Sequence, residues 1–83
     1  MSAVYKFLNT EIALNTTGNT VNTAKVVRVV NANNSLTMCV IANTTATYAN
    51  VTLAPYEAVT IEKSPTDTVA GVNLRAVSIA YRN

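Results

Sequence analysis

Apolar and polar residues alternate along several short segments of the chain. In the segment 58–63, Val59 and Ile61 are separated by polar or small residues. Successive side chains of a β-strand point to opposite faces, so this spacing predicts a strand with one core-facing side. No segment shows the 3.6-residue apolar period of an amphipathic helix.

Other segments carry apolar residues on both faces. In 23–30, Val27 and Val29 share one face while Val26 and Val30 share the other, which predicts a central strand covered on both sides. In the last segment, the alternation places Val77, Ile79 and Tyr81 on the apolar side. The predicted strands cover residues 4–8, 12–14, 23–30, 36–42, 47–53, 58–63 and 74–81.

Turn-forming residues separate these segments. A loop rich in Asn, Thr and Gly spans 15–20, and the Asn-rich segment 31–35 is predicted to be a hairpin loop, because Asn tolerates positive φ. Six or seven short strands at a spacing of about ten residues predict an all-β fold, a small antiparallel β-sandwich or barrel. We expect residues 1–83 to form one domain.

The segment 64–68 carries the strongest local signals. Ser64 is a favourable N-cap, Pro65 suits the first helical position, and Asp67 lies where a capping-box carboxylate would lie. The sequence therefore predicts a one-turn helical corner in which Asp67 accepts backbone hydrogen bonds. The structural corner comprises Ser64, Pro65, Thr66, Asp67 and Thr68.

Composition agrees with a protein of strands and turns. There are 13 Thr, 12 Val and 11 Asn residues among 83, and β-branched side chains favour the pleated surface of a sheet. The six basic residues are scattered and the net charge is +2. We expect solubilising charge rather than a nucleic-acid interface, and neither a targeting segment nor a membrane span.

Residues for catalysis are scarce. The chain has no His and a single cysteine, Cys39, which lies among apolar neighbours and is expected to be a small buried hydrophobe. Without a His base or a second Cys, neither a nucleophilic site, a zinc site nor an internal disulfide is expected. The sequence predicts a protein that is not an enzyme, with no catalytic, metal-binding or cofactor-binding residues.

A chain this short buries little surface alone, and small domains gain stability from disulfides, metals or partners. Self-association is therefore expected. The interface candidates are Tyr48, Tyr56, Tyr81 and Arg82; for each tyrosine, a partly buried core position is the alternative. Phe7 is expected to lie in the core.

Three segments together carry a resemblance to a known class of proteins. These are residues 5–11 (YKFLNTE), 62–68 (EKSPTDT) and 76–83 (AVSIAYRN). Together they resemble small virion structural proteins of tailed phages that infect marine cyanobacteria. The most specific element is the corner 62–68.

This resemblance implies a β-structured protein present in many copies on the virion. It implies a capsid decoration (cement) protein that binds the major capsid protein or another virion protein and stabilises the head shell. Such a protein would be made in the host cytoplasm without a signal peptide. The alternative is a small binding or adaptor module, associated with the tail or neck or directed at a host protein or a glycan.

Overall fold

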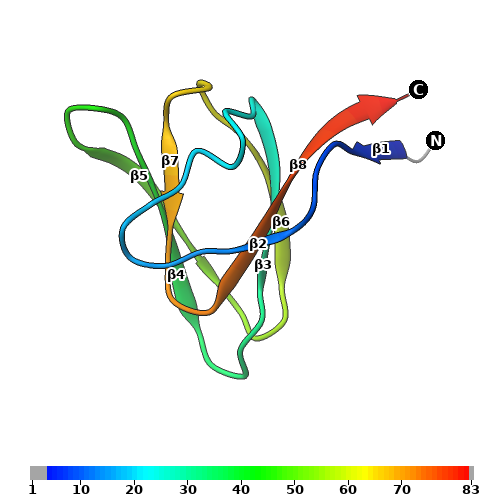
Figure 1. Ribbon diagram of the computed structural model, residues 1–83. Helices are drawn as coiled ribbons and strands as arrows, with labels where there is room; N and C mark the ends of the chain where they lie inside the picture. Colours follow the sequence, from blue (N-terminus) through cyan, green and yellow to red (C-terminus); the bar gives the residue numbers. More distant parts are fainter. Residues whose placement is uncertain (1–3, 83) are drawn as a thin grey trace.

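The computed structural model describes residues 4–82, and the side chains of residues 6–80. Within this range the chain forms eight antiparallel strands and no helix. They are β1 (Val4–Phe7), β2 (Ile12–Ala13), β3 (Val26–Asn31), β4 (Thr37–Ala42), β5 (Thr47–Leu53), β6 (Ala58–Glu62), β7 (Thr68–Ala70) and β8 (Leu74–Arg82). The predicted all-β sandwich is confirmed, and the barrel alternative is wrong because the sheets do not close (Figure 1).

The larger sheet is built around β8. This strand pairs with β3 on one side, and with β1 and β2 on the other; β6 pairs with the far side of β3. Because β1 pairs with the end of β8 and β2 with its beginning, the two short strands lie one after the other along the same edge. The longest strand of the fold thus organises the N-terminal segment.

The smaller sheet has the order β5-β4-β7, and a bridge between Asn19 and Val69 extends it beyond β7. Only β4 and β5 form a hairpin between consecutive strands, whereas the connections after β3, β5, β6 and β7 pass from one sheet to the other. The hairpin predicted at 31–35 is therefore wrong. Asn31 is buried, and its side chain ties this connection to the end of β5.

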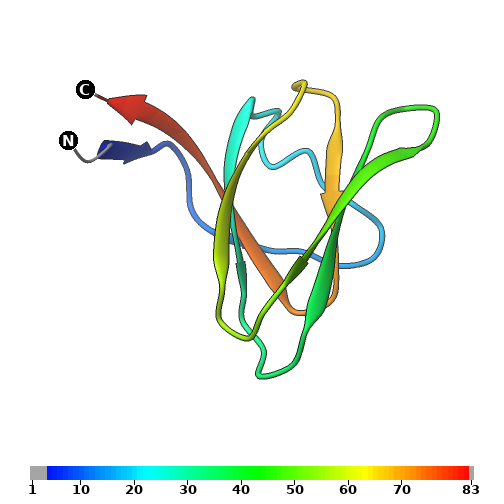
Figure 2. The ribbon, with the colours of Figure 1, turned by 180° about the vertical axis from the view of Figure 1, so that it is seen from behind.

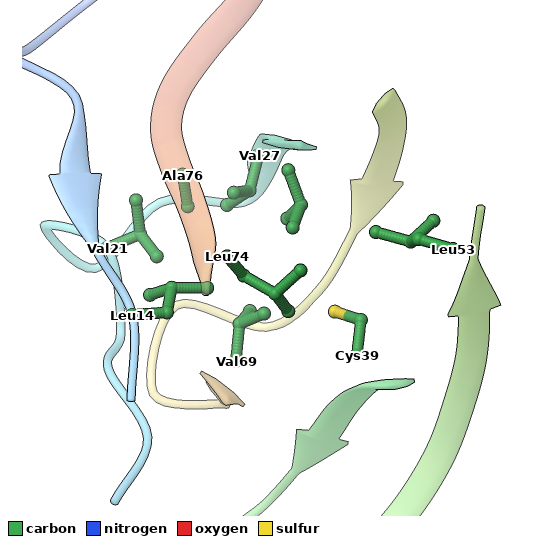
Figure 3. Packing of buried hydrophobic residues seen from close by; sticks show 9 residues of the cluster. Leu14, Val21, Val27, Cys39, Leu53, Val69, Leu74 and Ala76 are labelled. Atoms are coloured by element: carbon green, nitrogen blue, oxygen red, sulfur yellow. The ribbon is translucent and has the colours of Figure 1, made fainter. Parts of the chain in front are cut away.

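The core lies between the two sheets (Figure 3). Val27 and Val29 are fully buried there, while the residues that alternate with them in β3 are only partly buried. β3 is central, as predicted, but a second layer covers only one of its faces. The buried hydrophobic cluster comprises Leu14, Val21, Val27, Val29, Cys39, Leu53, Val69, Leu74 and Ala76.

The face of β8 that points to the core is not the predicted one, which carries Val77 and Ile79, but the opposite one. Leu74 and Ala76 belong to the core cluster, whereas Val77 and Ile79 occupy the other face of the strand. Those two side chains are nevertheless also buried. The alternation of residues therefore could not predict which face of β8 points to the core, since both faces carry apolar residues.

β1 and the end of β8 form a two-stranded arm that extends away from the sandwich (Figures 1 and 2). Phe7, which pairs with Ile79 in this arm, is 62% exposed. The expected core position of Phe7 is wrong, because β1 pairs with the part of β8 that has no opposing sheet. No helix in the described range is long and apolar enough to cross a membrane.

Candidate functional site

The predicted corner joins β6 to β7. Its backbone closes through a hydrogen bond from the Asp67 amide to the Ser64 carbonyl (3.0 Å), and the Asp67 carboxylate accepts a bond from the Ser64 amide (3.3 Å). The carboxylate thus makes the backbone bond that the sequence predicts. The helical turn is wrong: the corner is a single β-turn, because Thr68 already pairs with Ala42 in β7.

Tyr48 joins the corner from β5. Its hydroxyl donates to Asp67 Oδ2 at 2.6 Å, while half of the tyrosine remains exposed. This hydrogen bond raises the pKa of Tyr48 above its usual value, and burial and the negative charge of Asp67 act in the same direction. The sequence predicted Asp67 as part of the corner and Tyr48 as an interface candidate. It did not predict the hydrogen bond between them, because the two residues are 19 positions apart.

Lys63 lies beneath the corner and is buried. Its ammonium group donates to the backbone carbonyls of Ala24 (2.7 Å), Ser64 (3.3 Å) and Pro65 (3.5 Å). Burial lowers the pKa of Lys63, and the nearby Asp67 charge opposes that shift. Lys63 therefore holds backbone segments together and is not the solubilising charge expected from the sequence.

A shallow hollow of about 320 Å³ lies beside the corner. Lys25 and Glu62 contribute opposite charges to it, and Tyr48 also lines it. No nucleophile paired with a base lines it, so the geometry suits the binding of a polar group rather than a reaction. Its lining residues are Lys25, Tyr48, Glu62, Lys63, Ser64 and Pro65.

A second surface is strongly apolar. Leu36, Met38 and Val72 are 69%, 51% and 55% exposed, and they border a hollow of about 500 Å³ beside β4 and β7. Val40 and Ala70 also line this hollow, and none of its lining residues is charged. Alternation correctly grouped Leu36, Met38 and Val40 on one face of a strand. It did not reveal that this face points outward.

The remaining interface candidates lie elsewhere. Tyr56 is 68% exposed at the turn between β5 and β6, where its φ of 61° is unusual for a bulky residue. Tyr48 and Tyr56 are not brought together, because Tyr48 lies at the beginning of β5 and Tyr56 follows its end. Tyr81 and Arg82 belong to β8 by their backbone, but their side chains lie outside the described residues.

Cys39 is fully buried in the core, as predicted. Burial raises the pKa of its thiol to about 11, which disfavours the thiolate at neutral pH. Among the residues described, no three His, Cys, Asp or Glu side chains are grouped so that they could hold a metal ion.

Comparison of the chain with protein-family models, with curated proteins and with solved structures found no match.

Proposed function

We propose that this protein is a structural component of a phage virion, a decoration protein that binds the head shell and stabilises it. The observation that carries the proposal is the uncharged apolar surface around Leu36, Met38 and Val72, which has the composition of a protein contact site. The resemblance of residues 5–11, 62–68 and 76–83 to small virion proteins supports the major capsid protein or another virion protein as the partner.

The chemistry of the described residues supports a binding role. The single thiol is buried with a raised pKa, and the buried Lys63 is committed to backbone carbonyls. The hydrogen-bonded corner gives rigidity rather than reactivity. A rigid sandwich with an apolar face can bind without reorganising, which lowers the entropic cost of association.

The proposal is tested by mass spectrometry of purified particles together with a binding assay on shells that lack the protein. Met38→Glu places a charge on the exposed apolar surface and should weaken shell binding by at least about tenfold. The matched control is Ala58→Glu, at an exposed position of β6 in the other sheet. Absence of the protein from particles, or full binding by Met38→Glu, would contradict the proposal.

The exposed Tyr56 favours a second candidate, a small module that binds a host protein or a glycan. An aromatic ring held outward by a turn can stack on the apolar face of a sugar. In a glycan-binding assay with the isolated protein, Tyr56→Ala should abolish binding while Met38→Glu should leave it intact. This candidate would be ruled out if the protein bound no glycan and Tyr56→Ala bound the shell as tightly as the natural chain.

A further inference from the structure

The outer edge of β5 is an open strand edge. Among the strands of the described range, β5 is the last of its sheet, and it pairs only with β4 along Thr47–Leu53. Among residues 4–82, no hydrogen bond outside the β4 ladder reaches the backbone of Thr47–Thr52. The unpaired amide and carbonyl groups along such an edge can accept another strand.

The other edges of the described sandwich carry protection. Beyond β7, Asn19 exchanges two backbone hydrogen bonds with Val69, at 3.0 and 2.9 Å. β6 ends in the exposed Glu62, β1 contains the exposed Lys6, and β2 has only two residues. Charges, coverage and short length are the devices by which β-proteins prevent unwanted pairing.

β5 has no comparable protection in its second half. It contains neither a charged residue nor proline, and its one irregularity lies near its start, where the register with β4 shifts between Ile41 and Ala42. From Ala49 to Leu53 the ladder is regular. A regular, uncharged run of five residues is long enough to form a ladder with a second strand.

We propose that the edge Ala49–Leu53 pairs antiparallel with the same edge of a second copy of this chain, about a two-fold axis at Val51. The two smaller sheets then form one continuous sheet in the order β7-β4-β5-β5-β4-β7. In this register Asn50 faces Thr52 of the other copy on the exposed side. Ala49 faces Leu53, and Val51 faces its counterpart, on the core side.

The residue pattern of the edge selects a second copy as the occupant. The net charge of +2 on each copy opposes self-association, and this edge keeps that repulsion small because it carries no charged residue. The β5 edge brings together only uncharged side chains, and its polar and apolar positions match themselves in the two-fold register. This pairing does not depend on the proposed virion role, and it is tested on the purified protein alone.

Cysteine cross-linking tests both the pairing and its register. Mixing Asn50→Cys with Thr52→Cys should give a disulfide-linked dimer, because directly opposed residues have Cα atoms about 4.5–5.5 Å apart, within disulfide range. Each variant alone should cross-link much less, since its own copies meet only diagonally. The buried Cys39 does not compete. The matched control, Ala58→Cys mixed with Glu62→Cys on the exposed edge of β6, should not cross-link.

Charged variants test the pairing without covalent chemistry. In sedimentation, Asn50→Lys/Thr52→Lys and Asn50→Glu/Thr52→Glu should each dimerise at least about tenfold more weakly than the natural chain. An equimolar mixture should recover the dimer, because each lysine then faces a glutamate, and a misfolded variant could not show this recovery. A natural chain that sediments as a monomer and gives no cross-link would overturn the pairing. Preferential cross-linking of Asn50→Cys to itself would overturn the register.

Discussion

At the residue scale, buried polar groups hold the connections between the sheets. Asn31 is fully buried, and its side-chain amide donates to the carbonyls of Ser35 (2.8 Å), Leu53 (3.2 Å) and Ala54 (3.1 Å). Its side-chain oxygen accepts from the Asn33 amide at 3.0 Å. One residue thereby fixes the crossover after β3 against the end of β5.

Replacing Asn31 should be costly. Asn31→Ala leaves several carbonyl groups without this donor, and we expect a loss of about 2–3 kcal/mol in the free energy of unfolding. Denaturant unfolding measures the loss. The control is Asn34→Ala, which removes an exposed side chain and should change stability by less than about 0.5 kcal/mol. Equal effects of the two variants would contradict the assigned role.

Backbone strain is also a property of single residues here. Val21, Asn22 and Thr23 have φ values of 54°, 59° and 54°, a left-handed turn built without glycine. At Val21 and Thr23 this conformation costs about 1–2 kcal/mol each, whereas Asn22 tolerates it. The turn places the fully buried Val21 in the core, and that burial, worth about 1.5–3 kcal/mol, offsets part of the strain.

Glycine substitutions should separate strain from burial. Thr23→Gly removes strain at an exposed position and should stabilise the protein by about 0.5 kcal/mol after the entropic cost of glycine. Val21→Gly removes similar strain but also the buried side chain, and should destabilise by at least about 1 kcal/mol. Thermal unfolding of both variants distinguishes the two effects. A stabilising Val21→Gly would show that its burial does not offset the strain.

At the element scale, the corner between β6 and β7 depends on a strand that is distant in sequence. Tyr48 of β5 donates to the same Asp67 oxygen that accepts from the Ser64 amide. The corner and the beginning of β5 should therefore behave as one unit.

A double-mutant cycle tests this coupling. Asp67→Ala should lower stability by about 1 kcal/mol, because it removes the carboxylate that accepts from the Ser64 amide and the Tyr48 hydroxyl. Tyr48→Phe should also destabilise, and the double variant should cost less than the sum of the two single variants. The nearby exposed Thr66→Ala should be nearly neutral. Strict additivity would mean that the tyrosine bond contributes nothing to the corner.

The strands that the sequence predicted correctly are apolar segments bounded by turn-forming residues, whether or not they alternate cleanly. β6 was recognisable because Val59 and Ile61 face the core at alternate positions. β7 was missed, because three residues are too few to show a period and its pairing with β4 is non-local. For the same reason, the pattern around Asn31 indicated a turn but could not show that the chain changes sheets there.

The candidate site was only partly predictable. Local turn chemistry identified Asp67 and its backbone bond, whereas the burial of Lys63 depends on carbonyls of residues as distant as Ala24. The exposed apolar face of β4 was also beyond prediction. A strand with two apolar faces does not reveal which one another layer will cover.

At the scale of the whole molecule, the sandwich shields one thiol between its sheets. Cys39 lies on β4, the central strand of the smaller sheet, and points into the core (Figure 3). An alkylating reagent can reach this thiol only when the sheets separate. Its labelling rate should therefore report global unfolding and rise with denaturant in proportion to the equilibrium unfolding constant.

The same burial predicts an alkaline weakness. The folded thiol keeps its proton up to a pKa of about 11, whereas an exposed thiol has a pKa of 9.0. The folded state therefore binds more protons between these values, and stability falls as pH rises through this window. We expect a contribution of order 2 kcal/mol, measured as the difference in unfolding free energy between the natural chain and Cys39→Ala as pH increases. Because other groups titrate in both proteins, only this difference isolates the thiol. A difference that stays constant from pH 9 to 11 would show that the thiol is accessible to water in the native sandwich.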